Sequence, residues 1–272
     1  MTKRRIRANG QSRNNVESIY KWIVTERSAK LRSVSYFCCD KGYTHPIFYL
    51  TMINASTFSF LSELALNNDK NWFDANKPRY QTVKKNMEEF AGQIIERLAQ
   101  LDTDIAGIEA KNAIFRINRD VRFSKDKSPY KTHIGLWLAK GGKKSTFAGY
   151  YVHIEPGKSF FGAGLYMPAT PELRKVRQEI AYCFEEFTGI INDPDFQKYY
   201  PGIQIEGHTL TKVPAGYAPD HRAAEFLRLK SFFGIHSVTD EQLMQPDSVA
   251  YIVEGLNAGT PLSHFLNRGM ED

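Results

Sequence analysis

The alternation of apolar and polar positions divides the chain into three regions from residue 52 onward. In the first region, apolar residues three or four positions apart predict helices, and the longest stripe consists of Tyr80, Val83, Met87, Phe90, Ile94 and Leu98. Strand-like alternation then predicts an antiparallel meander of about four to five strands over residues 113–168. Helical spacing returns at Thr170-Pro171-Glu172, where proline occupies the first helical position. This order predicts an α+β fold in which helices from both flanks pack with the meander.

Turn-forming residues set the boundaries of the predicted strands. Strands are expected over Phe115–Phe123, Thr132–Ala139, Phe147–Glu155 and Phe160–Met167. If Pro156-Gly157 forms a two-residue turn, Tyr151 lies opposite Gly162 in the next strand. A glycine inside a strand often marks the close approach of another group. This register therefore predicts a shallow recess beside Tyr151 and His153.

Further helices are expected in the carboxyl-terminal flank. One begins at Asp220, and another begins with the capping-box pattern of Thr239 and Gln242 and runs through about Gly255. The last begins at Thr260-Pro261, where proline again follows a capping residue. No strand is predicted in this flank.

The net charge of +6 is unevenly distributed along the chain. Residues 1–51 hold ten basic and three acidic residues, whereas residues 52–272 hold 26 basic and 27 acidic residues. Within the second range, residues 111–144 alone hold ten basic and two acidic residues. A local positive field on an otherwise acidic body favours a focused anion-binding site over a broad nucleic-acid surface.

The same charge boundary suggests the domain organisation. Residues 52–272 are long enough for a single α+β domain with a substantial core. Residues 1–51 start with a basic cluster, but no apolar segment follows it as a secretory signal would require. We interpret residues 1–51 as a basic extension outside the domain, either disordered or the result of a misassigned start.

Cysteine usage and hydropathy indicate the cellular setting. Cys38, Cys39 and Cys183 provide neither a disulfide framework nor a metal-binding spacing. The sequence has no apolar run long enough to span a bilayer. These features predict a cytoplasmic protein without a membrane partner, and they leave its oligomeric state open.

The richest chemistry lies in residues 115–133, FRINRDVRFSKDKSPYKTH. Guanidinium and ammonium groups suit phosphate and carboxylate ligands. The residues expected to bind such an anion are Arg116, Arg119, Arg122, Lys125, Lys127, Tyr130 and Lys131. His133 or His153 could act as general acid or base, with Asp120 orienting a group nearby. The sequence therefore predicts a site for a small anionic molecule, and whether the site is catalytic stays open.

Two alternatives from other functional classes remain. Lys143 and Lys144, with Tyr130 and Trp137, could supply charge and stacking for a nucleic acid. Alternatively, the arginines could form internal ion pairs in a non-catalytic interaction or scaffold domain. The excess of one acidic residue over residues 52–272 argues against a large nucleic-acid footprint, and the sequence contains no recognised nucleic-acid-binding module.

A metal ion and a cofactor are not expected. His133, His153 and Glu155 have metal-ligating side chains, but nothing in the sequence fixes their proximity, and the surrounding positive charge disfavours a cation. The sequence also lacks a complete dinucleotide-binding fingerprint, a Walker A motif and a serine-nucleophile motif.

The central stretch also resembles a known family. FRINRDVRFSKDKSPYKTH at residues 115–133 is similar to the largely bacterial family called domain of unknown function 2461. Supporting matches are NNDKNWFDANKPRY at 67–80, GYYVHIEPGKSFFGAGLYMP at 149–168 and LRLKSF at 227–232. The resemblance spans residues 52 to about 269 and implies that residues 1–51 lie outside the family domain. Because the family has no assigned function, the resemblance supports the fold and the positions of the site but implies no reaction.

Overall fold

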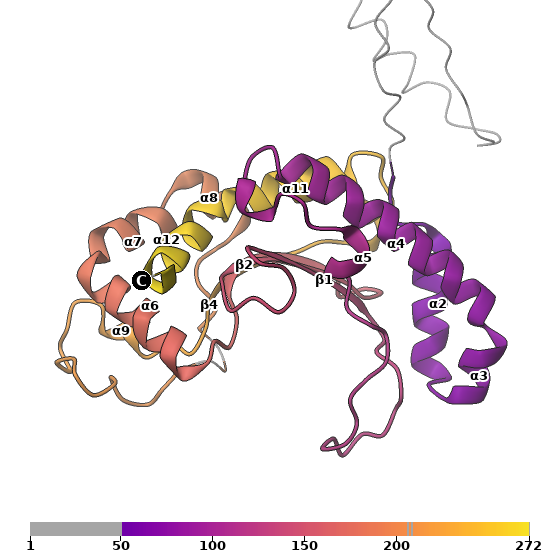
Figure 1. The fold of residues 1–272 in the computed structure, drawn as a ribbon, viewed down its shortest axis with the longest axis horizontal. Helices are drawn as coiled ribbons and strands as arrows, with labels where there is room; N and C mark the ends of the chain where they lie inside the picture. The colour runs from indigo at the N-terminus through magenta and orange to yellow at the C-terminus, as the bar shows by residue number, and fades with distance from the viewer. Residues whose placement is uncertain (1–50, 206, 208, 272) are drawn as a thin grey trace, which may run out of the picture. The chain divides into compact units, whose positions relative to one another are not determined.

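A computed structural model describes residues 51–205, 207 and 209–271 of the chain (Figure 1). The extension predicted for residues 1–51 therefore lies, apart from Thr51, outside the described residues. Among the described residues, no helix is both long enough and apolar enough to cross a membrane.

Along the chain, helices precede and follow the strands of a small sheet. The described part begins with α2 (Ala55–Leu66), α3 (Lys70–Ala75), α4 (Lys77–Leu98), the 3-10 helix η1 (Thr103–Ile105) and α5 (Ala110–Ala113). The strands β1 (Ile134–Ala139), β2 (Gly149–Ile154) and β3 (Phe160–Leu165) follow. Next come α6 (Thr170–Tyr182), α7 (Phe184–Ile191), α8 (Pro194–Tyr199), α9 (Ala224–Leu227) and β4 (Phe232–Ser237). The chain continues with α10 (Asp240–Leu243), α11 (Ser248–Ala258) and α12 (Thr260–Glu271). This content confirms the predicted α+β class.

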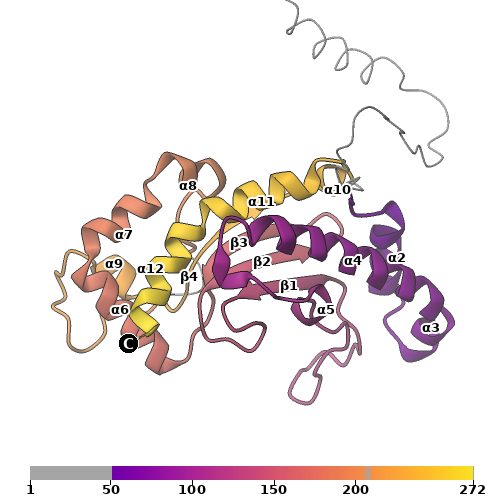
Figure 2. The same ribbon diagram turned by 45° about the horizontal axis from the view of Figure 1, so that its top comes forward.

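The four strands form one antiparallel sheet in the order β1-β2-β3-β4 (Figure 2). In the β2–β3 hairpin, Tyr151 pairs with Gly162, which confirms the register predicted from Pro156-Gly157. The turn is closed by the Lys158 N–H, which donates to the Glu155 carbonyl oxygen at 2.9 Å. The predicted strand boundaries around residues 132–139, 147–155 and 160–167 agree with β1, β2 and β3 to within two residues.

The fourth strand does not come from the predicted meander. Strand β4 pairs with β3 after an intervening run of helices, so the sheet extends beyond residues 113–168. The helix predicted from Asp220 is limited to α9, because the following residues leave the helix and enter β4. The capping box of Thr239 and Gln242 is present, but it caps the short helix α10, and α11 begins separately at Ser248.

The strand predicted over Phe115–Phe123 is wrong. Within this segment the structure has one isolated bridge, between Asn118 and Tyr130, and a second bridge, between Ile114 and Leu136, directly precedes the segment. We call residues 116–130 the arm, since they project from the sheet as a long loop (Figure 1). Phe123 is 95% exposed in the arm, so the apolar alternation does not reflect a buried strand face. The alternation misled because the second half of the segment has no core to pack against.

The base of the arm is fixed to the amino-terminal helices. The Asn68 side chain bonds both backbone groups of Tyr130: its amide nitrogen donates to the carbonyl oxygen at 2.9 Å, and its oxygen accepts from the N–H at 3.0 Å. The Tyr130 ring stacks on Phe73 with centroids 4.0 Å apart. Tyr130, which the sequence suggested as an anion ligand, is thus a buried anchor.

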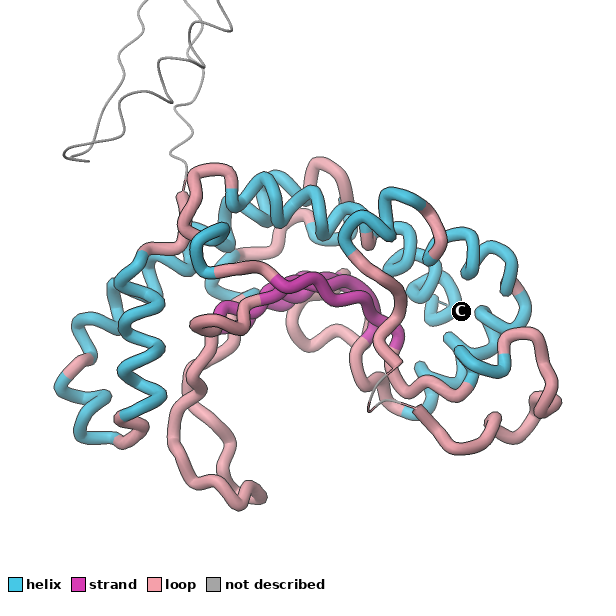
Figure 3. The backbone as a smooth tube through the Cα atoms, turned by 180° about the vertical axis from the view of Figure 1, so that it is seen from behind, coloured by secondary structure: helices cyan, strands magenta, loops and turns pink. Residues whose placement is uncertain are grey.

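The two faces of the sheet have different neighbours. Helices α11 and α12 contact β3, α4 packs against α11, and these helices lie over one face (Figures 2 and 3). Side chains alternate between the faces, so buried Tyr150, Val152 and Phe161 point toward the helices. Tyr151 and His153 therefore point to the opposite face, which we call the open face.

Two glycines allow α11 to lie close to β3. A Cβ atom on Gly255 would lie 2.3 Å from the ring of Phe161, and a Cβ atom on Gly259 would lie 2.2 Å from the Cβ atom of Ala163. Any side chain at either position would push the helix away from the sheet. The helix-covered core therefore depends on these two small residues.

Gly259→Ala should destabilise the protein by about 1–3 kcal/mol, because the added methyl group overpacks the helix–sheet contact. The matched control is Gly189→Ala in α7, where an added Cβ atom would have no neighbour within 4 Å. That change should stabilise by about 0.5–1 kcal/mol, since alanine favours a helix over glycine. Denaturant unfolding of both variants measures the difference, and equal effects would contradict the close approach.

Candidate functional site

A cavity of about 800 Å³ lies on the open face of the sheet. Gly149, Gly162 and Gly164 form part of its floor, because they belong to the central strands β2 and β3. Aromatic side chains make up much of its wall, and they are Phe115, Trp137, Phe147, Tyr151, Phe160, Tyr166 and Phe233. Its size falls within the range of small-molecule sites in proteins.

The floor is hollow because no side chain fits there. A Cβ atom on Gly162 would lie 2.5 Å from the carbonyl oxygen of Gly234. Gly164 has a φ of +125°, which other residues rarely adopt. On β1, a Cβ atom on Gly135 would lie 2.4 Å from the Tyr151 hydroxyl oxygen, so the Tyr151 ring lies over Gly135. The predicted recess beside Tyr151 and His153 is therefore present.

Two lysines give the cavity a positive charge. The Nζ atoms of Lys131 and Lys143 lie 5.3 Å and 5.5 Å from the centroid of the Phe115 ring, and both residues line the cavity. Lys143 donates to the Ile114 carbonyl oxygen at 2.8 Å. Neither lysine has a carboxylate within ion-pair distance among the described residues. Burial, followed by the charges of Arg116 and Lys143, lowers the pKa of Lys131.

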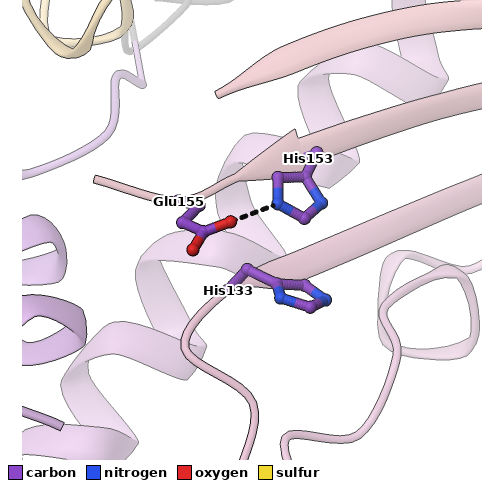
Figure 4. Close-up of side chains that lie close together, drawn as sticks. All are labelled: His133, His153 and Glu155. Atoms are coloured by element: carbon purple, nitrogen blue, oxygen red, sulfur yellow. Dashed lines mark hydrogen bonds and ion pairs between the residues drawn. The ribbon is translucent and has the colours of Figure 1, made fainter. Parts of the chain in front are cut away.

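A row of hydrogen-bonded side chains runs along β2 on the same face. The hydroxyl group of Tyr151 lies 3.2 Å from Nδ1 of His153, and Nε2 of His153 lies 3.0 Å from Oε2 of Glu155 (Figure 4). Burial is the largest single influence on Glu155 and opposes its ionisation, but the hydrogen bond from His153 and the nearby positive charges together outweigh it and lower the pKa of the carboxyl group. An ionised carboxylate only accepts hydrogen bonds, so Nε2 of His153 carries a proton, and in the neutral imidazole Nδ1 then accepts a hydrogen bond from Tyr151. Burial raises the pKa of Tyr151 to about 12, which keeps its hydroxyl group a donor.

His133, which directly precedes β1, lies beside this row of side chains. Its ring centroid lies 4.3 Å from that of His153, and Figure 4 shows the two imidazoles beside Glu155. Burial, with a further contribution from His153, lowers the pKa of His133 to about 4, so its imidazole is neutral near pH 7. The nitrogen and oxygen atoms that His133, His153 and Glu155 could offer to a metal ion all lie within 4.8 Å of one another. This arrangement can transfer a proton or ligate a metal ion.

The other candidate residues lie in the arm. Arg119 pairs with Asp126 and donates to the Ser128 carbonyl oxygen, and Arg122 pairs with Asp120 at 2.6 Å. Asp120 therefore orients an arginine and is not joined to either histidine. Lys127 donates to the Val121 carbonyl oxygen at 3.0 Å.

Arg116 and Lys125 are exposed residues of the arm. The charge of Arg116 contributes to lowering the pKa of both Lys131 and Asp120. Of the residues proposed as anion ligands from the sequence, Lys131 is the one that lines the cavity.

The anion-binding and catalytic candidates from the sequence did not include Tyr151, Glu155 and Lys143, although the sequence placed Tyr151 beside the recess, Glu155 among possible metal ligands and Lys143 among possible nucleic-acid contacts. The first two could have been included, because strand alternation already placed them on the same face as His153. Lys143 could not, since it lies in the loop between β1 and β2, whose path the sequence does not specify.

A second cluster of possible metal ligands lies elsewhere in the fold. Asp102, Asp104 and His264 bring their ligand atoms within 4.8 Å of one another. The buried carboxylate of Asp102 already accepts a hydrogen bond from Tyr150 at 2.6 Å and lies 3.1 Å from Nε2 of His264. Burial and the hydrogen bond to Asp102 raise the pKa of Tyr150. This cluster connects the helices to the sheet through groups that are already hydrogen-bonded.

The fold and the cavity define an α+β protein with a helix-covered sheet and an aromatic, positively charged cavity on the open face. The chain belongs to the family described as conserved hypothetical protein (DUF2461), which matches residues 56–265. This confirms the resemblance found in the sequence. No match was found among curated proteins or among solved structures.

The hydrogen-bond row predicts the tautomer of His153. In protein treated with a chelator, two-dimensional ¹H–¹⁵N spectra at neutral pH should show the proton of His153 on Nε2, because the Glu155 carboxylate requires a donor. Glu155→Gln removes the charge and should allow the Nδ1-protonated form to appear. An Nδ1-protonated His153 in the unaltered protein would contradict the described row.

Proposed function

We propose that the protein binds a small organic anion in the cavity on the open face. The apolar part of the ligand packs against the aromatic wall, and its phosphate or carboxylate group pairs with Lys131 and Lys143. The observation that carries the proposal is the presence of two ammonium groups on an aromatic cavity of about 800 Å³ without a carboxylate partner among the described residues.

Charge supports an anion as the occupant. A half-buried ammonium group loses hydration, and the lowered pKa of Lys131 reflects this cost together with repulsion from Arg116 and Lys143. An anionic ligand compensates both effects and forms charge-assisted hydrogen bonds, which are stronger than neutral ones. Arg116 adds to the attraction at longer range, because its charge acts on Lys131.

The wall supports a ligand with a flat apolar part. Phe115 lies near both ammonium groups, and Tyr151 lies 6.4 Å from Phe115 between ring centroids. Phe160 continues the wall at 5.8 Å from Tyr151. Such rings stabilise a bound ring or chain by dispersion and by removing apolar surface from water.

The arginines of the arm have a different role in this proposal. Arg119 and Arg122 have their own carboxylate partners, as the scaffold interpretation expects. The exposed Phe123 lies at the end of a basic segment, with the Arg122 guanidinium 5.8 Å from its ring centroid. A nucleic acid would contact the arm, whereas a small anion would contact the cavity.

Thermal melts of the full chain should identify the class of ligand. The panel contains inorganic phosphate, nucleotides, sugar phosphates, aromatic and aliphatic carboxylates and short oligonucleotides. At about one hundred times its dissociation constant, a ligand stabilises by roughly 2.7 kcal/mol. In a domain of this size that corresponds to an increase of roughly 5–10 °C in the melting temperature. We expect an organic anion to produce this shift.

Matched variants separate the cavity from the arm. Lys131→Ala and Lys143→Ala should each reduce the shift, and the double variant should abolish it. Lys125→Ala, which removes an exposed lysine of the arm, should leave it unchanged. A shift that survives the double variant would overturn the proposal. A shift confined to oligonucleotides and reduced by Lys125→Ala would instead favour nucleic-acid binding by the arm.

A further inference from the structure

We infer that His133, His153 and Glu155 bind a divalent transition-metal ion at the edge of the cavity. His133 directly precedes β1, His153 lies in the neighbouring strand β2, and Glu155 directly follows β2; their candidate ligand atoms all lie within 4.8 Å of one another (Figure 4). His153 also lines the cavity, so a metal held here would be within reach of a molecule bound there.

The donor set selects the kind of ion. Imidazole nitrogen suits zinc, nickel, cobalt and iron, whereas magnesium and calcium prefer oxygen ligands alone. Two histidines and one carboxylate satisfy only part of the coordination shell of such an ion. The remaining positions would be available to water or to the anionic group of a ligand in the cavity.

Small movements would complete the site. Zinc binds nitrogen and oxygen at roughly 2.0–2.2 Å, which brings ligand atoms to roughly 3–4 Å from one another. Nε2 of His153 and Oε2 of Glu155 are already 3.0 Å apart. His133 forms no hydrogen bond or ion pair with another described residue, so its ring can rotate toward the ion without losing a partner.

Tyr151 supports the change that metal binding requires in His153. In the metal-free protein Nε2 carries the proton, whereas a metal on Nε2 requires the proton on Nδ1. The Tyr151 hydroxyl group, 3.2 Å from Nδ1, can donate to a bare nitrogen or accept from a protonated one. Such outer hydrogen bonds orient metal-bound histidines. Phe160 stacks on the His153 ring at 4.7 Å between centroids and limits its tilt.

Electrostatics makes Glu155 the decisive ligand. The charge of Lys131 acts on His133, and it opposes a cation at this point. Glu155 is the one negatively charged member of the group. The substitution Glu155→Gln removes the charge but keeps the shape of the side chain. It should therefore weaken metal binding more than a shape-preserving substitution of an uncharged neighbouring residue.

The second cluster provides a control within the same chain. Asp102, Asp104 and His264 have similar ligand atoms at similar separations. Asp102 is already hydrogen-bonded to Tyr150 and His264, and Lys140 lies 3.8 Å from Asp104 as a counter-charge. We expect no metal there, so His264→Ala is the matched variant.

The test uses the full chain, freed of metal with a chelator and then dialysed. Cobalt(II) is titrated while visible absorption is recorded, and zinc(II) is titrated by calorimetry. We expect the unaltered protein to bind one equivalent of metal. The affinity for the metal should fall by at least about 100-fold in His133→Ala and in Glu155→Gln. Loss of a direct ligand should cost more than loss of an outer hydrogen-bond partner, which usually lowers metal affinity about 10–100-fold. His264→Ala should bind as the unaltered protein does.

Further measurements keep the outcome unambiguous. Circular dichroism and melting temperatures check that the variants are folded, and His133→Ala is the primary variant because His133 is less buried than His153. Absence of metal binding by the unaltered protein, or binding by His133→Ala and Glu155→Gln as tight as that of the unaltered protein, would overturn the inference. The Lys131→Ala and Lys143→Ala double variant should still bind cobalt, so failure of the anion proposal is distinguishable from failure of this one.

Discussion

The close contact between α11 and β3 is the constraint on which the rest of the fold depends. Gly255 and Gly259 let the helix lie directly on Phe161 and Ala163, and the side chains that β1, β2 and β3 present to this face are buried. With the helices on that side, Tyr151 and His153 of β2 point to the other face. The cavity, the histidines and the two lysines all result from this unequal covering.

The sequence predicted the parts of the site that follow strand periodicity. Alternation in β2 placed Tyr151, His153 and Glu155 together, and the Pro156-Gly157 turn gave the correct register. Periodicity carries no information about which distant strand lies alongside, so β4 was missed. For the same reason, the proximity of His133 to His153 could not be deduced from either strand alone.

The charge count located the positive segment, but it could not separate the arginines that are paired with carboxylates from the lysines that line the cavity. The excess of basic residues over residues 111–144 includes Arg119 and Arg122, which are neutralised locally, and Lys131 and Lys143, which are not. Which carboxylate meets which arginine depends on the path of a loop. The loop path depends in turn on the Asn68 hydrogen bonds to Tyr130, a contact between residues 62 positions apart.

The anchoring of Tyr130 has a consequence for how this fold can diverge. Tyr130 immediately precedes Lys131 and is held through Phe73 and Asn68, while the Lys131 N–H donates to the Ile117 carbonyl oxygen at 2.8 Å, so these contacts all lie at the base of the arm. Exposed loop ends tolerate insertion and replacement, because few contacts are lost there. The arm can therefore change in length and composition while the cavity keeps its geometry. Evolution or an engineer can graft a new recognition loop at this position without rebuilding the site beneath it.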